Sequence, residues 1–419
     1  MKNTVLFQRY FYAWAIFLPI TSFLLVPSVQ GTTIAYVFAL ASVVVVLFGS
    51  VFREKLYISN IVLFILLYIL LYLLSQFGLL YGHAVDFTGI NLVDKEKLNV
   101  FFRSSSITQS LYLFSGVLTF LFVKNFYKET WDRYIYIGAL IIAAYGFYEI
   151  TYFQVFHTNG DFVSNRMFGE HTGSWFQLTQ IGSLTIERLK SLTGEPSMAA
   201  FTLLPYWIYA LHKRKYLIQF IFLAALLLTT STTAYIGIVL YGACMIAFFR
   251  LKDKFNAMIP ILCLIMGLAL YNPISNYFKL FLWDKFFTTN ISGTERQNSF
   301  DFHLDFFHHL SLMNKLFGIG FGVIRSADMF STLLVNVGIV GILLVTLFFL
   351  VPIVKLRRSY ENNGLKILII VIYATMMMAV SEFAYLPTWL FLGIAYNKLN
   401  QQKRTSSEAG QHDLKKDLY

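Results

Sequence analysis

Long apolar runs separated by short polar connections fill most of the chain. They lie near residues 10–28, 32–52, 57–82, 105–123, 133–155, 197–211, 216–231, 233–249, 256–271, 330–354, 365–383 and 386–398. A helix needs about 20 mostly apolar residues to cross the hydrocarbon core of a bilayer, and shorter runs can cross as broken helices. The pattern therefore predicts an all-α polytopic membrane protein, with about twelve transmembrane helices in a single domain over residues 1–419.

One polar interruption leaves two interpretations open. Residues 229–233 read Thr-Thr-Ser-Thr-Thr and divide one long apolar stretch into two short halves. Either two short helices meet at a polar bend, or one long helix is kinked there.

The composition supports a membrane protein and argues against a nucleic-acid-binding one. Hydrophobic residues make up 57% of the chain and charged residues 13%, whereas a soluble domain carries about 25% charged residues. The net charge of +11 comes from Lys and Arg in short clusters between apolar runs rather than from a basic stripe on a soluble face. Cys244 and Cys263 both lie in apolar runs, which is typical of small buried hydrophobic residues.

The distribution of basic residues predicts the orientation. If the N-terminus is cytoplasmic, most of the 33 Lys and Arg residues fall in inside segments, such as Lys213-Arg-Lys215 and the segment that follows the last apolar run. Cytoplasmic loops are enriched in Lys and Arg. We therefore expect a multi-pass membrane protein with both termini on the cytoplasmic side.

Three outside segments are longer than the other connections, at 83–104, 156–196 and 272–329. Long loops in compact chains are usually functional or disordered. The second and third keep many aromatic residues, so we expect two large periplasmic or extracytoplasmic loops that fold as short interfacial helices over the bundle. The segment 83–104 is assigned no role.

The loop 156–196 ends in a cationic and acidic string. Arg188, Lys190 and Glu195 precede Pro196, which stands where an apolar run begins. Proline is favoured in the first turn of a helix, so a capped helix end explains part of the pattern. The alternative is a site for an anionic lipid-linked substrate, because the planar guanidinium group of Arg binds phosphate with several hydrogen bonds.

The loop 272–329 holds Ser292-Gly-Thr-Glu-Arg296, then His303, His308 and His309. The histidine spacing does not favour a metal site, because neighbouring residues point to different faces of a helix. Gly318-Ile-Gly-Phe-Gly322 follows without a preceding strand, so it predicts a tight turn rather than a dinucleotide-binding loop. Asp328 comes next, and then Asn336, Gly338 and Gly341, whose small size favours close helix packing.

These motifs, in this order, resemble the superfamily of O-antigen polymerases and O-antigen ligases, which have a GT-C-like glycosyltransferase architecture. The resemblance covers roughly residues 130–345. It rests on the string from Arg188 to Pro196, the polar break at 229–233, the Gly-Thr-Glu-Arg296 segment, and the glycine run at 318–322 followed by Asn336-Val-Gly338-Ile-Val-Gly341.

One departure favours a polymerase over a ligase. Ligases of this superfamily usually carry a His about eleven residues before the first Gly of the closing motif, whereas residues 325–329 here read Arg-Ser-Ala-Asp-Met. The resemblance thus implies polymerisation of undecaprenyl-pyrophosphate-linked oligosaccharide units into O-antigen, capsular polysaccharide or exopolysaccharide. The resemblance also implies a multi-pass protein of the bacterial cytoplasmic (inner) membrane, surrounded by membrane lipids, with a chain-length regulator as a candidate partner.

The implied activity assigns roles to residues. Arg188 and Arg296 would clamp the pyrophosphate, with Arg166, Lys190 and Arg325 as further substrate-binding candidates. Glu195 is the first candidate for the general base and Asp328 the second. Fixed cations can stabilise the leaving group, so we expect a metal-independent glycosyltransferase without a cofactor.

Four other functions stay open: an O-antigen ligase, a related cell-wall polymerase, a polysaccharide flippase or other transporter, and a sensor or structural membrane protein. Transporters usually show internal repeats and ionisable groups near mid-membrane. The chain shows no clear repeat, and Glu149 and Glu382 lie near the ends of apolar runs.

Overall fold

The computed structural model describes residues 2–27, 29, 31–49, 53–81, 87–88, 90–94, 103–168, 171–181, 184–249 and 291–416. The helices of the first half are α1 (Lys2–Phe17), α2 (Ile34–Gly49), α3 (Arg53–Tyr81), α4 (Ser104–Phe126), α5 (Asp132–Phe156), α6 (Pro196–His212), α7 (Tyr216–Leu228) and α8 (Thr232–Phe248). Those that follow are α12 (Ile291–His309), α13 (Leu312–Phe317), α14 (Met329–Lys355), α15 (Tyr360–Ala379) and α16 (Leu386–Lys416). Short 3-10 turns precede α5 and α6, at η1 (Glu129–Trp131) and η2 (Ser191–Thr193).

Several helices have the length and the apolar character expected of a membrane-embedded protein. Within the described ranges, 5 helical segments are long and apolar enough to cross a membrane: Tyr57–Tyr81, Ser104–Phe126, Glu129–Phe156, Met329–Lys355 and Tyr360–Ala379. Shorter apolar helices cover Ile34–Phe48, Tyr216–Leu228 and Thr232–Phe248. Most predicted apolar runs in the described chain fall largely on a helix, but the run 10–28 does so only in part, because α1 ends at Phe17 and residues 18–27 are not helical. The run at 256–271 lies outside the described residues.

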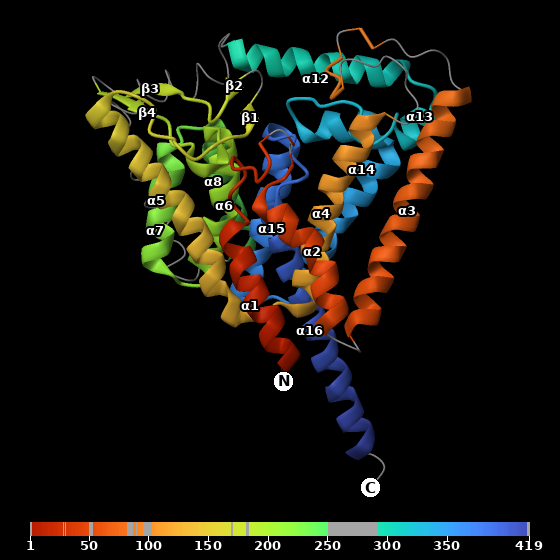
Figure 1. Cartoon of the computed structure of the whole chain (residues 1–419). Coiled ribbons are helices and arrows are strands. Elements are labelled where there is room, and N and C mark those ends of the chain that lie inside the picture. The colour runs from red at the N-terminus through yellow and green to blue at the C-terminus, as the bar shows by residue number, and fades with distance from the viewer. Residues whose placement is uncertain are drawn as a thin grey trace.

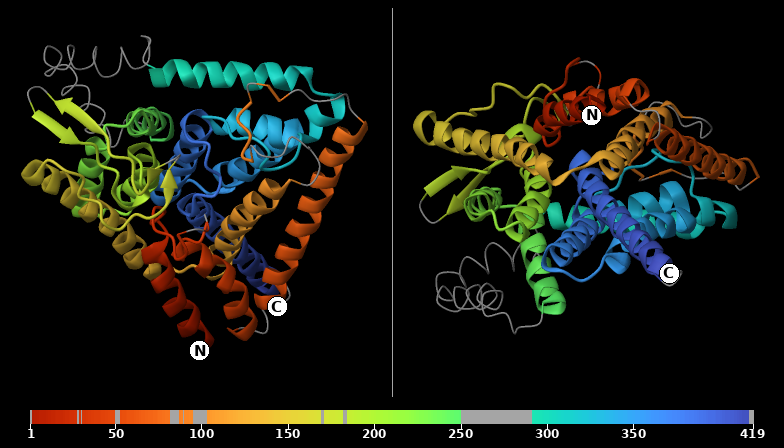
Figure 2. Two further views of the ribbon diagram at one scale, coloured as in Figure 1. Left: turned by 45° about the horizontal axis from the view of Figure 1, so that its top comes forward. Right: turned by 90° about the horizontal axis from the view of Figure 1, so that it is seen from below.

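The helices form a bundle whose two ends differ (Figure 1). The N-terminus and the far end of α16 lie together at one end, called the terminal end below. The helix α12 and the strands lie across the other, called the loop end. The helix α6 is enclosed within the bundle, since its side chains from Met198 to His212 are all buried and it packs against α5, α7, α8, α15 and α16. The view from below in Figure 2 shows α5 and α7 on one side of the bundle and α3 on the other.

The loop 156–196 does not fold as predicted. Instead of short helices it forms two antiparallel hairpins, β1 (Met167–Phe168) with β2 (His171–Thr172), and β3 (Leu178–Ile181) with β4 (Leu184–Glu187). Thr and Ile side chains favour extended backbone, and these two runs flank Gly182-Ser183, a pair typical of tight turns. The expectation of interfacial helices is therefore wrong for this loop, while the described chain is otherwise mostly helical, as an all-α membrane protein is. In the loop 272–329 the described part forms the helices α12 and α13 and then a non-helical run, 318–328, that leads to α14.

The polar stretch at 229–233 joins two helices. The helix α7 ends at Leu228 and α8 begins at Thr232, and Thr230 between them has a left-handed φ of 45°. The hydroxyl of Ser231 caps α8 by accepting a hydrogen bond from the amide of Thr233. The interpretation of two short helices meeting at a polar bend is confirmed.

The glycine run at 318–322 docks against a break inside α14. Gly318 has a φ of 75° and Gly338, within α14, a φ of 66°. The side chain of Asn336 binds the backbone of Ile324 twice, accepting from its amide and donating to its carbonyl oxygen. The predicted role of Gly338 is to allow close packing between helices. In the structure Gly338 instead allows the turn 316–318 to approach the α14 backbone.

We expect Gly338→Ala to destabilise the fold strongly. A Cβ atom at Gly338 would overlap the backbone carbonyl group of Leu316, and the positive φ adds strain of about 1–3 kcal/mol for a non-glycine residue. The matched control is Gly242→Ala in α8, where a Cβ atom meets nothing within 4 Å and where Ala is the better helix former. Thermal unfolding of the purified variants should show a lower midpoint for Gly338→Ala alone. Equal midpoints would contradict the packing described here.

Candidate functional site

Arg188 and Glu195, predicted to act together, lie close to one another at the loop end. Each side chain also has protein partners. The guanidinium group of Arg188 donates to Thr230 Oγ1 (2.9 Å), to the carbonyl oxygens of Thr229 and Thr230 (3.2 Å each) and to Gln177 Oε1 (2.6 Å). It thereby fastens the loop to the α7–α8 bend. Glu195 stands at the start of α6, accepts from the Ser197 hydroxyl and lies within electrostatic range of Arg188.

Lys190 lies inside the fold rather than at a binding surface. Its fully buried ammonium group donates to Glu149 Oε1 (3.0 Å), to Asn159 Oδ1 (3.0 Å) and to Glu187 Oε1. An ammonium group has three donors, so none is left for a substrate. The Ser191 amide binds the second oxygen of Glu149 (2.8 Å). We call Glu149, Glu187 and Lys190 the buried triad.

The charges of the buried triad interact without solvent between them, because all three side chains are fully buried. Burial raises the pKa of the Glu187 carboxyl, and the neighbouring Lys190 ammonium opposes that rise. Two carboxylates share a single cation here, so each depends on Lys190 for its charge to be tolerated. The predicted substrate-binding role of Lys190 is replaced by a structural one, in which it anchors the segment that carries Arg188 and Glu195.

Asp328, the second predicted base, caps a helix. Its carboxylate accepts from the Ser331 amide (2.7 Å), the Ser331 hydroxyl (2.6 Å) and the Ser326 hydroxyl (3.2 Å) at the start of α14. Such caps stabilise helices by satisfying free amide groups. Arg296 falls on α12, and its side chain is not among those that the structure describes.

Of the other two predicted arginines, Arg325 pairs with Glu382, and Arg166 has neighbours in common with Glu382. Arg325 Nη2 lies 2.9 Å from Glu382 Oε2, and Arg166 Nη1 donates to the carbonyl oxygen of Thr21 (3.3 Å). Glu382 and Arg166 both lie within electrostatic range of the phenol groups of Tyr36 and Tyr112. Residues from both large loops thus converge on the connection between α15 and α16. We call the side chains of Tyr36, Tyr112, Arg166, Arg325 and Glu382 the Glu382 cluster.

The sequence analysis assigns Glu382 no role in the site, because this residue lies near the end of an apolar run. One signal could have found it: Ser381-Glu382-Phe383 stands where two apolar runs are broken without a basic cluster between them. Ionisable residues at such breaks are costly in a membrane and usually functional. In the structure Glu382 lies in the non-helical link between α15 and α16, and its side chain is 11% exposed.

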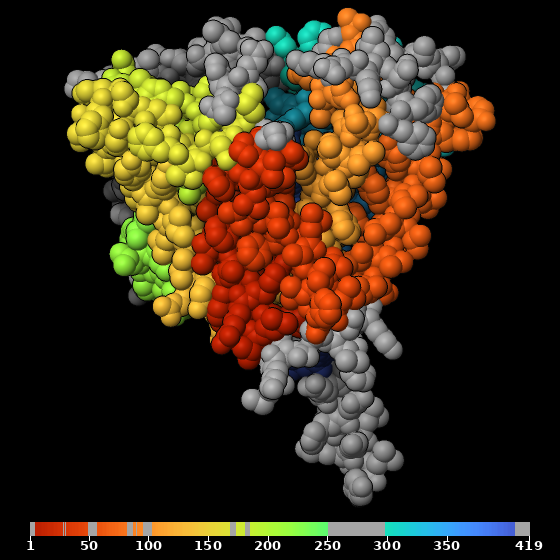
Figure 3. Space-filling view, in the orientation of Figure 1, coloured from red at the N-terminus to blue at the C-terminus, as the bar shows by residue number. Residues whose placement is uncertain are grey.

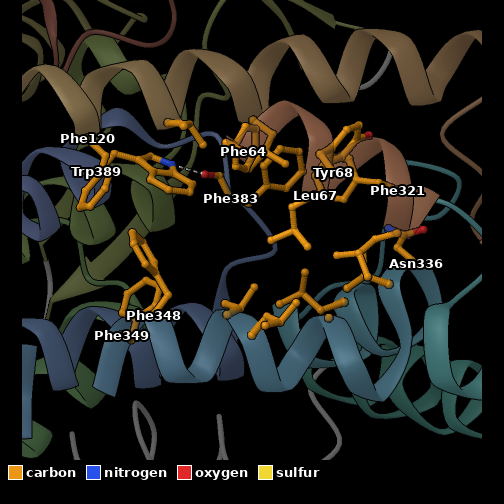
Figure 4. Close-up of a pocket in the computed structure, with 18 of the residues that line it drawn as sticks. Phe64, Leu67, Tyr68, Phe120, Phe321, Asn336, Phe348, Phe349, Phe383 and Trp389 are labelled. Atoms are coloured by element: carbon orange, nitrogen blue, oxygen red, sulfur yellow. Dashed lines mark hydrogen bonds between the residues drawn. The ribbon is translucent and has the colours of Figure 1, made fainter. Parts of the chain in front are cut away.

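An apolar groove begins beside the Glu382 cluster. A cavity of about 450 Å³ is lined by α3, α4, α14 and α16. It follows α14 from Met329 to Phe349, a helical distance of roughly 30 Å. In Figure 4, Phe321 and Asn336 lie at one end of this groove, and Phe120, Phe348 and Trp389 lie at the other.

Phe383 connects the cluster to the groove. It is the neighbour of Glu382, lines the cavity and packs edge-to-face on Phe321. Its carbonyl oxygen accepts a hydrogen bond from Trp389 Nε1 (2.7 Å), drawn in Figure 4. The charged groups of Arg325 and Glu382 therefore stand at the loop end of an aromatic, apolar groove.

The groove reaches one face of the bundle between α3 and α4. A second cavity of about 350 Å³ shares Phe64, Tyr68 and Tyr72 with the first and continues to Ile107 and Leu111 of α4. Figure 3 shows the face on which α3 and α4 lie. An apolar groove that opens sideways between two apolar helices can admit a lipid chain from the bilayer.

No protein-family model matches this chain, and no curated protein matches it in sequence. Among the described residues, no three His, Cys, Asp or Glu side chains are grouped so as to hold a metal ion. The ring Nδ1 of His303 binds the carbonyl oxygen of Ser299, and that of His309 binds the carbonyl oxygen of Asp305. The features of the described residues that could bind a ligand and take part in a reaction are Arg166, Arg325, the Glu382 carboxylate and the apolar groove.

Proposed function

We propose that this protein is a polysaccharide polymerase that joins undecaprenyl-pyrophosphate-linked oligosaccharide units. The observation that carries the proposal is the pairing of the half-exposed Arg325 with Glu382 beside an apolar groove, where Arg166 of the other large loop shares the neighbour Tyr36 with Glu382. A polyprenyl pyrophosphate has the matching form, with an anionic head and a long apolar tail. Arg binds phosphate oxygens with paired, charge-assisted hydrogen bonds.

The proposed reaction is a transfer at the anomeric carbon. A hydroxyl group of the acceptor saccharide attacks this carbon, and the bond from the carbon to the pyrophosphate oxygen breaks. The electron pair passes to the pyrophosphate, and the hydroxyl proton passes to a carboxylate. Arg166 and Arg325 stabilise the negative charge that develops on the leaving group. No step requires a metal ion.

The orientation forms part of the proposal. The reaction takes place at the loop end, which faces away from the cytoplasm, and both termini are cytoplasmic. Basic residues at the terminal end support this: Lys213 and Lys398 there bind Glu129 and Glu361, and Arg357 lies nearby on the chain that leads into α15. Cytoplasmic ends of membrane helices are enriched in such residues.

The test uses the purified protein in lipid nanodiscs with isolated undecaprenyl-pyrophosphate-linked repeat units and EDTA. We expect release of undecaprenyl pyrophosphate together with a ladder of longer lipid-linked saccharides. Transfer of the glycan to lipid A core alone would identify a ligase instead. Movement of the lipid-linked unit across a sealed bilayer without any transfer would identify a flippase. If Mg²⁺ restores an activity that EDTA abolishes, the metal-free mechanism is wrong.

A further inference from the structure

The loop end holds several carboxylates, and their partners differ. Asp328 accepts three hydrogen bonds in a helix cap. Glu149 and Glu187 share the buried ammonium group of Lys190. None of these three can leave its partners without cost to the fold, because a buried carboxylate needs its hydrogen bonds or its counterion.

Among the described residues Glu382 has one strong partner, and that partner is accessible to solvent. Its Oε2 atom lies 2.9 Å from Arg325 Nη2, while the contact that the described residues give its Oε1 atom is a long one of 3.4 Å from the Ala384 amide. The side chain of Arg325 is 49% exposed, whereas that of Glu382 is 11% exposed. An anion arriving at the loop end can therefore contact Arg325 without moving Glu382.

A pyrophosphate group competes well for this arginine. It carries more charge than a carboxylate and offers oxygens on two phosphorus atoms to the planar guanidinium group. The connection that bears Glu382 is non-helical, and its next residue, Phe383, lines the groove. A lipid tail in the groove would bring its pyrophosphate group next to Arg325.

We infer that Glu382 is the catalytic base of the proposed transfer, paired with Arg325 at rest and released when the donor pyrophosphate binds Arg325. This inference rests on the proposed function. The released carboxylate accepts the proton of the acceptor hydroxyl as its oxygen bonds to the anomeric carbon. The electron pair of the broken bond leaves with the pyrophosphate, held by Arg325. Donor binding thus frees the base only when a leaving group is in place.

The test is Glu382→Gln, assayed with the lipid-linked repeat units in nanodiscs. Glutamine keeps the shape and an oxygen that can accept from Arg325, but it cannot take up a proton at neutral pH. We expect turnover per folded molecule to fall by about 10²–10⁴-fold. Binding of undecaprenyl pyrophosphate, measured on the same preparation, should be equal or tighter, because a neutral amide competes less for Arg325.

Glu195→Gln is the competing variant, since Glu195 is the other candidate base and also lies at the loop end. A loss of less than tenfold for Glu382→Gln would overturn the inference, and so would a large loss confined to Glu195→Gln. Weaker pyrophosphate binding in Glu382→Gln would overturn it too, because Glu382 would then only position Arg325. An inactive wild-type protein would instead contradict the proposed function.

A second comparison applies if Glu382→Gln fails to fold because Arg325 is left without its partner, since position 325 is neutral in both variants compared. Arg325→Gln is compared with the double variant Arg325→Gln, Glu382→Gln. A base at Glu382 predicts that the double variant turns over at least tenfold more slowly than Arg325→Gln. Equal rates would show that Glu382 takes no proton.

Discussion

Replacing Lys190 with methionine is expected to destabilise the fold by about 3–5 kcal/mol, because removing one partner of a buried ion pair leaves uncompensated charge. The side chains of Lys190, Glu149 and Glu187 are all 0% exposed. Methionine fills a similar volume, so the loss is one of charge and hydrogen bonds rather than of packing. The measurement is thermal unfolding in detergent, together with the yield of folded protein.

The matched control for Lys190→Met is Lys398→Met at the terminal end. Lys398 also binds two carboxylates, but those of Glu129 and Glu361 are 65% and 46% exposed. Solvated ion pairs contribute about 0–1 kcal/mol, so this variant should unfold near the wild-type temperature. If both variants behave alike, the buried triad does not hold the loop.

A compensating variant separates charge from packing. Changing Glu149 and Glu187 to glutamine in the Lys190→Met background removes the charges that Lys190 neutralises. We expect this triple variant to recover most of the lost stability, because replacing a whole buried network often costs little. No recovery would mean that Lys190 acts through its shape.

The sequence predicts the helices well and the contacts between loops poorly. Apolar runs such as 105–123 and 330–354 reflect contact with lipid or with other helices, which is a local property of the chain. They fall within α4 and α14. The hairpin of β3 and β4 was missed because an aromatic loop beside a membrane suggests interfacial helices, although Thr and Ile in alternating runs favour strands.

The site was misjudged because its contacts are distant along the chain. Lys190 bonds Glu149, 41 residues before it, and a lysine near a membrane surface has the same sequence context whether it faces water or a buried carboxylate. Arg325 and Glu382 are 57 residues apart. The arginines could be named from composition and resemblance, but the choice among them required the fold.

Loss of both Arg166 and Arg325 is expected to reduce turnover more than any other change at the proposed site. Removing one preorganised donor to a developing anion costs about 10²–10³-fold in rate in other enzymes. We therefore expect at least that loss from Arg325→Gln alone and a larger loss from the variant that also carries Arg166→Gln. Polymer in cells that rely on the variant should shorten to single repeat units.

The control and the conservative change decide whether geometry or charge matters. Arg404→Gln removes the same charge from an exposed position on α16 at the terminal end and should leave turnover within about twofold, because screened charges that far from the site act weakly. Arg325→Lys keeps the charge but loses the planar pair of donors, so we expect it to bind undecaprenyl pyrophosphate more weakly than the wild-type protein. Wild-type polymer length from the double Arg166→Gln, Arg325→Gln variant would remove both arginines from the mechanism. The pyrophosphate would then have to be held elsewhere, and the Gly-Thr-Glu-Arg296 segment of α12 would be the next to test.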